Sequence, residues 1–267
     1  KIGRTKISNN MGLAEWIQID SSKIGISQEG KFIKIITPKD SLITDNYWVY
    51  YDEFKILDKL VNVYKIDLRA KYRKGRVYFL VLKKGLRRSF WPNILPLIDE
   101  FRGLELLSIR SKGITSLKFK KLPRLKSLYI HNGSNLKDTL ILPASFKQLQ
   151  QLYLRSSQIS YIIFPVKFYK LTEIRIADSN ISYIDDSFAN LPNLDTLSIS
   201  QSKLIEVNPV LEKLPKLSQL YLDGNKLTDF NLKIPSLKEL LLLDNPIKDT
   251  SALKKRYPQF ELRFTDR

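Results

Sequence analysis

The chain of 267 residues is 43% hydrophobic and 27% charged, a balance that predicts a packed globular core and excludes a disordered chain. It contains no cysteine, which excludes disulfides, thiolate metal sites and a thiol nucleophile. The excess of 45 lysines and arginines over 27 acids gives a net charge of +18, which favours an acidic protein, a nucleic acid or an anionic membrane as partner.

The sequence contains no recognisable targeting or membrane segment. Its first residues, "KIGRTKISNNMG", are polar, and apolar runs such as "VYFLVL" at 77–82 fall short of the ~18 residues that span a bilayer. We therefore expect neither a signal peptide nor a membrane anchor. Together with the absence of cysteine, this favours a cytoplasmic location.

The N-terminal region, residues 1–76, has patterns of both strand and helix. The expected elements are strands in "EWIQID" (15–20), "KFIKIIT" (31–37) and "VNVYKIDL" (61–68), and a helix in "WVYYDEFKILDKL" (48–60). One face of that helix would carry Tyr50, Phe54, Leu57 and Leu60. We interpret this region as a β-rich cap or small domain, with a separately functional domain as the alternative.

A strongly basic run follows at residues 69–88, "RAKYRKGRVYFLVLKKGLRR", which contains no acid. We expect "RAKYRKGR" to be a loop between strands near 62–68 and 77–82. The charges of this loop, with two lysines that follow the second strand, would then form a basic rim at one end of the molecule. The rim consists of Arg69, Lys71, Arg73, Lys74, Arg76, Lys83 and Lys84.

The rest of the chain repeats one pattern seven times: leucine-like residues at positions one, four and six, a small polar residue at nine and an aliphatic residue at eleven. The segments are "LELLSIRSKGI", "LKSLYIHNGSNL", "LQQLYLRSSQI", "LTEIRIADSNI", "LDTLSISQSKL", "LSQLYLDGNKL" and "LKELLLLDNPI", which begin at Leu104, Leu125, Leu149, Leu171, Leu194, Leu217 and Leu237. In a short strand, positions four and six share one face. Stacked copies would bury leucines that a single copy leaves exposed.

This pattern resembles the leucine-rich repeat family over residues 104–264, with "VYFLVLKKG" from Val77 as a degenerate eighth unit. The resemblance implies an α/β solenoid over residues 77–267: a horseshoe with a parallel concave sheet of about seven or eight strands and a C-terminal closing coil. The strands would centre on Leu107, Leu128, Leu152, Ile174, Leu197, Leu220 and Leu240.

In that family, an asparagine at position nine binds the backbone of neighbouring coils. Asn225 and Asn245 match it here, whereas Ser157, Ser179 and Ser202 are shorter substitutes and Lys112 and Gly133 depart from it. The resemblance therefore implies a structural ladder that is weakest in the first two repeats.

Residues for catalysis or metal binding are few. His131 is the sole histidine, and neither a zinc cluster nor a phosphate-binding glycine loop is present. Asp185 and Asp186 are the nearest thing to a carboxylate pair, but they fall on a convex loop where solvated acids are ordinary. We therefore predict no enzymatic activity, no metal and no cofactor.

The repeat register places positions two, three, five, seven and eight on the concave face. The N-terminal half of that face carries tyrosines and basic residues, and the C-terminal half collects Asp178, Asp195, Asp223, Glu239 and Asp244. Arginine and tyrosine are enriched at interface hot spots. The expected partner-binding residues are Arg110, Tyr129, His131, Tyr153, Arg155 and Arg175.

We interpret the chain as a non-catalytic protein-interaction scaffold that binds an acidic protein partner. One alternative is nucleic-acid binding through the basic region 69–126, since tyrosines stack on bases and arginines contact phosphates. A second is peripheral binding to anionic membranes through Phe90 and Trp91, beside Arg87 and Arg88. Core packing of those two aromatic side chains is the preferred interpretation.

Overall fold

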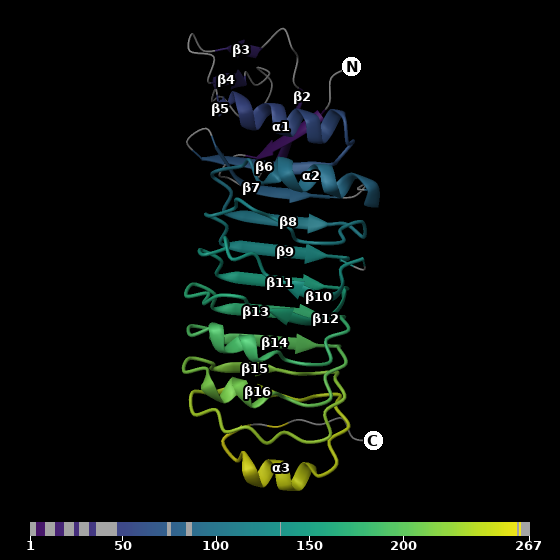
Figure 1. Cartoon of the computed structure of the whole chain (residues 1–267), viewed down its shortest axis with the longest axis vertical. Coiled ribbons are helices and arrows are strands. Elements are labelled where there is room, and N and C mark those ends of the chain that lie inside the picture. The colour runs from purple at the N-terminus through teal and green to yellow at the C-terminus, as the bar shows by residue number, and fades with distance from the viewer. Residues whose placement is uncertain are drawn as a thin grey trace.

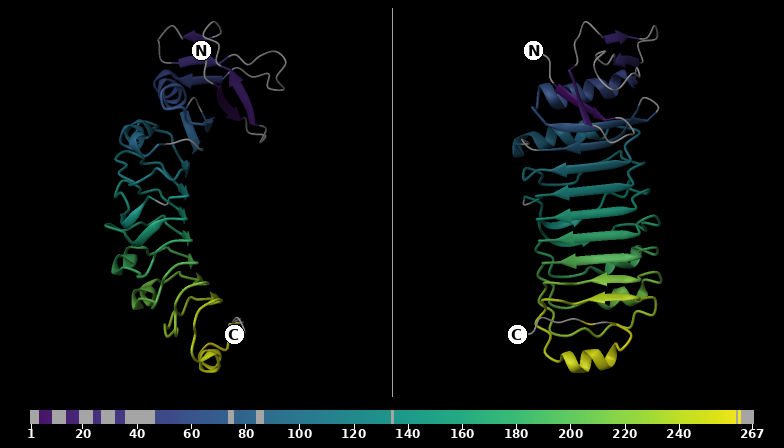
Figure 2. Two further views of the ribbon diagram at one scale, coloured as in Figure 1. Left: turned by 90° about the vertical axis from the view of Figure 1, so that its right-hand side faces the viewer. Right: turned by 180° about the vertical axis from the view of Figure 1, so that it is seen from behind.

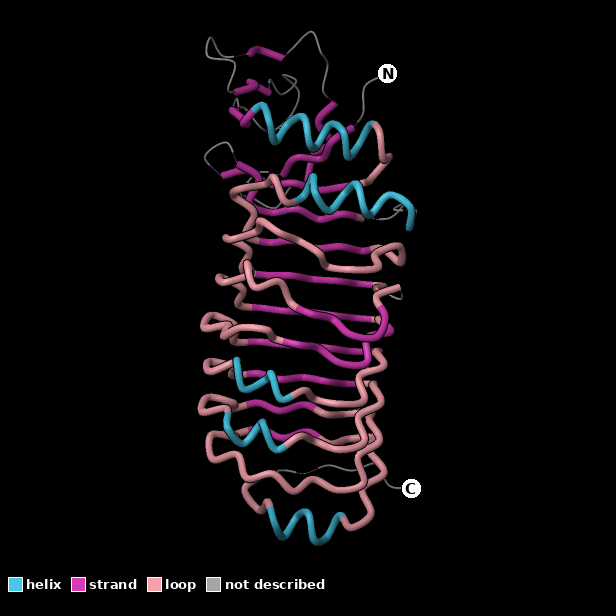
Figure 3. Tube along the Cα trace, viewed as in Figure 1, coloured by secondary structure: helices cyan, strands magenta, loops and turns pink. Residues whose placement is uncertain are grey.

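The computed structural model describes residues 4–8, 14–18, 24–26, 32–35, 47–73, 76–83, 87–133, 135–260 and 262. Successive coils stack along one axis, with the N-terminal elements at one end and a helix at the other (Figure 1). Seen from the side, the stack is curved, and the strands line its concave surface (Figure 2). The convex side is made of loops, short strands and single helical turns (Figure 3).

The elements fall into an N-terminal group and a repeat group. The N-terminal group is β1 (Arg4–Ser8), β2 (Ala14–Gln18), β3 (Ile24–Ile26), β4 (Phe32–Ile35), β5 (Tyr47–Tyr50), α1 (Tyr51–Asn62) and β6 (Leu68–Arg73). The repeat group is β7 (Arg76–Leu82), η2 (Arg88–Phe90), α2 (Trp91–Ile98), β8 (Leu106–Arg110), β9 (Ser127–His131), β10 (Lys137–Ile141), β11 (Gln151–Arg155), β12 (Gln158–Ile163), β13 (Glu173–Ala177), η3 (Asp186–Asn190), β14 (Thr196–Ser200), η4 (Pro209–Lys213), β15 (Gln219–Tyr221), β16 (Glu239–Leu241) and α3 (Thr250–Arg256).

The main sheet has eleven strands in the order β16-β15-β14-β13-β11-β9-β8-β7-β6-β1-β2. Every neighbouring pair from β7 to β16 is parallel, which confirms the predicted solenoid and its degenerate eighth unit. The sheet is wider than the seven or eight strands expected, because β6 pairs with β7 antiparallel and β1 pairs with β6 parallel. Local sequence pattern does not reveal such long-range pairing.

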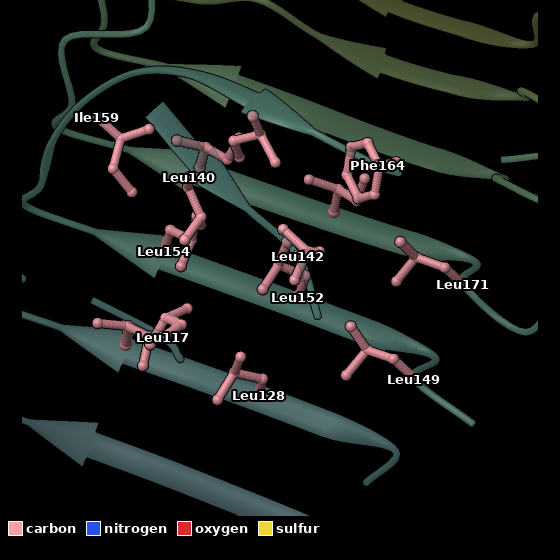
Figure 4. Close-up of a cluster of buried hydrophobic side chains, with 14 of the residues drawn as sticks. Leu117, Leu128, Leu140, Leu142, Leu149, Leu152, Leu154, Ile159, Phe164 and Leu171 are labelled. Atoms are coloured by element: carbon pink, nitrogen blue, oxygen red, sulfur yellow. The ribbon is translucent and has the colours of Figure 1, made fainter. Parts of the chain in front are cut away.

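The coils stack in strict register, so each repeat position lies beside the same position of the next coil. The fourth-position residues form one continuous row, which is Leu80, Leu107, Leu128, Leu152, Ile174, Leu197, Leu220 and Leu240. All fourth- and sixth-position side chains of the seven predicted repeats are buried, as the pattern indicates. Between the concave strands and β10, leucines such as Leu140, Leu142 and Leu152 pack into one cluster (Figure 4).

The eighth position of six repeats adopts a left-handed backbone where the chain leaves the strand. The residues are Asn132, Ser156, Asp178, Gln201, Gly224 and Asp244, with φ between 47° and 63°. Small polar residues and glycine tolerate this conformation best. At Gly224, where φ is 63°, glycine adopts this conformation without strain.

The ninth-position asparagines bridge neighbouring coils. Buried Asn225 accepts a hydrogen bond from the Leu204 N–H (3.1 Å) and donates to the carbonyls of Ile199 (2.6 Å) and Leu222 (2.9 Å). Asn245 repeats this arrangement one coil later, accepting from the Leu227 N–H at 3.0 Å and donating to Leu222 at 2.8 Å. One amide side chain thus satisfies backbone groups of two coils.

The shorter serines make fewer contacts between coils. The hydroxyls of Ser179 and Ser202 bond to each other at 2.9 Å, while buried Ser157 Oγ has no hydrogen-bond partner among the described residues. In the second repeat, Asn135 donates to the Lys112 carbonyl. Asn135 is at position eleven of that repeat, two residues beyond the ladder position, so the pattern alone does not assign it a contact between coils.

The predicted strand at 61–68 is wrong. Helix α1 continues to Asn62, and the strand is β6, which begins at Leu68. Within the stretch "RAKYRKGR", residues 69–73 likewise belong to β6 rather than to a loop, and Arg76 begins β7 opposite Arg73. Leu68, Ala70 and Val77 are buried there, so alternate residues of this basic stretch face the core.

Buried Glu53 joins α1 to the first coil. Its carboxylate accepts from the Val77 N–H at 2.6 Å and pairs with Arg76 at 3.2 Å, while the Arg76 guanidinium lies 3.8 Å from the Tyr50 ring centroid. Burial raises the pKa of Glu53, and these hydrogen bonds only partly offset it. The boundary proposed between residues 76 and 77 falls within β7, so the N-terminal region and the solenoid share one sheet.

The closing coil lies beyond β16. Leu253 of α3, Tyr257 and Leu262 are buried, and Phe260 packs against the same core. The Tyr257 hydroxyl donates to the Leu232 carbonyl at 2.8 Å. These side chains cover the leucines of the last repeats, which would otherwise be exposed.

Truncation of a fourth-position leucine will cost more stability than truncation of an exposed aliphatic residue. Leu152 is fully buried, so we expect Leu152→Ala to lower the free energy of unfolding by about 2–5 kcal/mol in a urea titration. Ile205 is 60% exposed and provides the control, for which Ile205→Ala should change stability by less than about 0.5 kcal/mol. Equal losses in the two variants would contradict the assigned core.

Removal of the Asn225 amide will leave buried backbone groups unpaired. We expect Asn225→Ala to lower the free energy of unfolding by about 1–3 kcal/mol. Asn225→Asp keeps the oxygen that accepts from the Leu204 N–H, but it replaces the amide N–H donor with a carboxylate oxygen. That oxygen would repel the carbonyl oxygens of Ile199 and Leu222, so this variant should be no more stable than the alanine variant. Asn231 is exposed, so Asn231→Ala serves as the control and should unfold at the wild-type urea midpoint. If both Asn225 variants also unfold at that midpoint, Asn225 does not stabilise the contact between coils.

Candidate protein-binding surface

The six residues expected to bind a partner lie on four neighbouring strands, β8, β9, β11 and β13. Tyr129, Tyr153 and Arg175 are direct cross-strand partners in one row. Arg110, His131 and Arg155 form the row two residues further along. The alternate residues of these strands, such as Leu128, Ile130, Leu152 and Leu154, are buried, so both rows lie on the face of the sheet that points away from the core. The repeat register therefore brings all six together, and we call this set the concave patch.

A stacked pair of tyrosines lies at the centre of the concave patch. The rings of Tyr129 and Tyr153 have centroids 4.5 Å apart and an interplanar angle of 11°. Strands spaced ~4.8 Å apart place identical side chains at this separation. Because each ring restricts the other, the pair forms a rigid aromatic surface that loses little entropy when it is covered.

Two side chains from position three hold the aromatic pair in place. Gln151 accepts hydrogen bonds from the Ser127 hydroxyl (2.9 Å) and the Tyr129 hydroxyl (3.3 Å). Its amide donates to Glu173 at 3.0 Å, and Glu173 accepts from Arg175 Nε at 2.6 Å. Sequence reasoning missed Gln151 and Glu173, although the order Ser127, Gln151, Glu173 along position three could have indicated them.

The surroundings of Glu173, at the centre of this network, favour its ionised form. Burial alone would raise the pKa of its carboxyl group, but hydrogen bonds from Arg175, Tyr153 and Gln151 outweigh burial and lower that pKa. Burial and the Glu173 carboxylate raise the pKa of Tyr153 to about 12. At neutral pH the tyrosine therefore keeps its proton and can donate.

The seventh-position row is rich in positive charge. Arg155 pairs with Asp178 at 3.0 Å, but both side chains are largely exposed, so the pair contributes little to stability. Arg110 is exposed and has no acidic partner among the described residues. Burial, together with the charges of Arg110 and Arg155, lowers the pKa of the half-buried His131.

The C-terminal half of the concave face repeats part of the arrangement. The Tyr221 hydroxyl donates to Glu239 at 2.6 Å, and Gln219 donates to the same carboxylate at 3.3 Å. Burial and Glu239 raise the pKa of Tyr221 to about 12. The Arg175 guanidinium lies 5.9 Å from the Tyr221 ring centroid and so links the two halves.

Acidic side chains of this C-terminal half accept hydrogen bonds from other residues of the chain. Asp195 accepts from the Ser218 hydroxyl at 2.5 Å, and Asp223 accepts from the Leu243 N–H at 2.9 Å. The acidic residues gather in this half as the sequence indicates, and some of them already accept hydrogen bonds within the chain.

The basic rim makes more internal contacts than a free loop would. Arg73 lies 4.3 Å from the Tyr78 ring centroid and pairs with Glu105 at 3.1 Å. Lys71 lies over Phe79 at 5.1 Å, and Lys83 pairs with Asp67 at 3.5 Å. Arg76 is held by Glu53.

Arg69 is the exception within the part of the rim that the structure describes. It is exposed on β6 and forms no ion pair with another described residue. Lys74 and Lys84 lie outside the described residues. Much of the positive charge of this hairpin is therefore already balanced or stacked within the molecule.

The aromatic residues considered for membrane binding pack inward. Trp91 is 1% exposed, and Phe90 meets the Tyr64 ring edge-on with centroids 5.4 Å apart. Across the described ranges, no helix combines the length and apolar character needed to cross a bilayer. Core packing thus accounts for both aromatic side chains.

Asp185 and Asp186 have structural contacts. Asp185 accepts from the Ser187 N–H at 2.8 Å and caps the helical turn η3, while Asp186 accepts from Asn208 at 2.9 Å. Within the described part of the chain, no three histidine or acidic side chains gather in a geometry for a metal ion. Two surface pockets, of about 460 and 390 Å³, include none of the concave patch residues.

Comparison with known proteins agrees with the coil geometry. Residues 169–227 match the leucine rich repeat family model. The structure resembles an internalin-like protein of Listeria monocytogenes, with 18% identity and a TM-score of 0.57 over 70% of this chain and 57% of that one. It also resembles InlP of the same organism, with 16% identity and a TM-score of 0.52 over 70% of this chain and 60% of the other.

No curated protein matches closely enough to extend the comparison. Because the identities to the solved structures are low and the chain spans 57% and 60% of their lengths, the likeness concerns the fold alone. The matched segment contains the repeats that begin at Leu171, Leu194 and Leu217, and the flanking coils keep the same strand register. Residues 169–227 therefore match the leucine-rich repeat family, and the stack of coils as a whole has the leucine-rich repeat solenoid fold.

Proposed function

We propose that this protein is a non-catalytic scaffold whose concave patch binds an acidic surface of a partner protein. The observation that carries the proposal is the stacked Tyr129–Tyr153 pair, held in place by Gln151 and Glu173 and flanked by exposed arginines. Tyrosine and arginine dominate the energetics of protein interfaces. A pre-ordered group of them is a surface suited to that use.

The shape of the surface favours a macromolecular partner over a small ligand. The six residues extend over four adjacent strands of the sheet, and the two pockets described above do not include them. Small-molecule sites are concave cavities that enclose most of the ligand. The family resemblance points the same way, although fold analogy alone does not define a function.

The charge of the concave patch favours acidic groups on the partner. Arg110, His131 and Arg155 are adjacent on three strands, and only Arg155 has an acidic neighbour in the described structure. The positive charges of Arg110 and Arg155 flank His131 and repel each other, and an anion bound between them would offset this repulsion. An acidic partner would supply that anion.

Nucleic acid is the second candidate, because stacked tyrosines beside arginines can also hold bases and phosphates. The acids of the C-terminal half oppose this, since a long phosphate backbone would pass over Glu239 and Asp223. The internal pairing of Arg73 and Arg76 also leaves fewer free cations on the rim than the sequence suggests.

The partner can be sought with matched tyrosine variants. Immobilised wild-type protein, Tyr153→Ala and Tyr169→Ala would each be exposed to an extract of the cells that produce the protein. Tyr169 lies outside the concave patch and is 60% exposed, so it controls for the loss of an accessible tyrosine. A specific partner should be retained by the wild type and by Tyr169→Ala but not by Tyr153→Ala.

For a partner identified in this way, Tyr153→Ala should weaken binding by about 30-fold, the effect of losing a 2 kcal/mol hot spot. The change should appear chiefly as faster dissociation in a surface-binding experiment. Tyr153→Phe keeps the stack and should retain most of the affinity. If the alanine variant binds like the wild type while remaining folded, the concave patch is not the binding surface.

Nucleic-acid binding predicts a different dependence on Arg69. As an unpaired rim cation, Arg69 can be reversed to glutamate without breaking a described ion pair. For a protein partner on the concave patch, Arg69→Glu should at most slow association in a salt-sensitive way. If it instead lowers equilibrium affinity for duplex DNA and flattens the slope of log affinity against log salt by about 0.9, the nucleic-acid candidate replaces the scaffold.

A further inference from the structure

We propose that Arg110, His131 and Arg155 form a binding site for an oxyanion carried by the partner. This proposal rests on the proposed function, because it specifies which chemical group of the acidic partner meets the concave patch. The group would be either the carboxylate of an aspartate or glutamate or the phosphate or sulfate of a modified side chain. All of these present oxygen acceptors to guanidinium and imidazole N–H donors.

The geometry of the row supports a single site rather than three side chains that act separately. Arg110 and Arg155 are the direct cross-strand neighbours of His131, one on each side. Strand spacing places the two arginine Cα atoms about 10 Å apart, with the imidazole between them. Two long, exposed side chains at this separation can both reach an anion located above the histidine.

The charges around His131 leave a local excess of positive charge. From β8 it faces Arg110, which has no acidic partner in the described structure, and from β11 it faces Arg155. Asp178, which follows β13, is the nearby acid, and it is paired with Arg155 through a largely exposed contact. An incoming dianion can compete with this exposed carboxylate for the guanidinium.

Anion binding at this site should be linked to a proton. In the free protein, burial and the two arginines lower the pKa of His131, so the imidazole is mostly neutral at pH 7. A bound anion favours the charged form and raises that pKa. Affinity should therefore increase as pH falls through the pKa of the complex and level off below the pKa of the free protein.

The sole histidine makes this site directly observable, because only one imidazole in the 267 residues gives a signal. The experiment is a proton NMR titration of His131 between pH 5 and 8 in sodium chloride, sodium sulfate and sodium acetate at equal ionic strength. Sulfate keeps its charge over this range and stands in for a phosphate or sulfate ester, and acetate stands in for a carboxylate side chain.

We expect sulfate to raise the pKa of His131 relative to chloride. A similar rise in acetate would assign the site to unmodified acidic side chains, whereas a rise in sulfate alone would assign it to modified ones. Identical pKa values in all three salts would overturn the proposal. This result would leave the scaffold function intact, because that function is tested separately by Tyr153→Ala.

Variants with one fewer arginine test whether the row acts as a unit. Arg110→Gln should raise the pKa of His131 in chloride, because a repelling charge is gone, and should weaken sulfate binding by about tenfold. Arg124→Gln is the control, because it removes the same charge from an exposed turn that precedes β9, whereas His131 is the last residue of that strand. This variant should change neither the pKa of His131 nor the affinity for sulfate. Equal effects of the two variants would show that net charge alone attracts the anion and would refute a built site.

Discussion

The structure depends on one constraint: a single coil cannot bury its own leucines. The fourth- and sixth-position side chains are buried in one core cluster that runs through the stack, and Figure 4 shows leucines of neighbouring coils packed together in part of it. The ends of the stack therefore need other cover. Buried residues of α1, α2 and β6 provide it at one end, and α3 with Tyr257 and Leu262 provides it at the other.

The same constraint creates the candidate binding surface. The buried leucines fix the register of the strands, and this register places the outward side chains of neighbouring strands beside one another. The outward residues need no attraction for each other to be brought together. Tyr129 thus lies beside Tyr153, and Arg110 lies beside His131. The fold imposes little on the identity of these outward residues, so the concave face can acquire a binding surface while the core remains unchanged.

The sequence alone predicts what depends on spacing. Burial of Leu152 and the juxtaposition of Tyr129 with Tyr153 follow from the repeat period. Contacts that depend on side-chain reach follow less directly. The repeat register places Gln151 beside Glu173, but it does not show which hydrogen bonds form there or that Arg155 pairs with Asp178. The error at residues 61–76 has another cause, since the end of α1 and the start of β6 are decided by long-range pairing with β7.

Hydroxyl-radical footprinting of the protein with its captured partner tests most directly whether the concave patch is the binding surface. Tyrosines on two sides of the molecule serve as reporters: Tyr129 and Tyr153 on the concave strands, and Tyr169 and Tyr183 in the segments outside them, which are 60% and 41% exposed. The account predicts that the partner protects Tyr129 and Tyr153 from modification and leaves the other two unchanged. Protection of Tyr169 and Tyr183, with Tyr129 and Tyr153 modified as in the free protein, would contradict it.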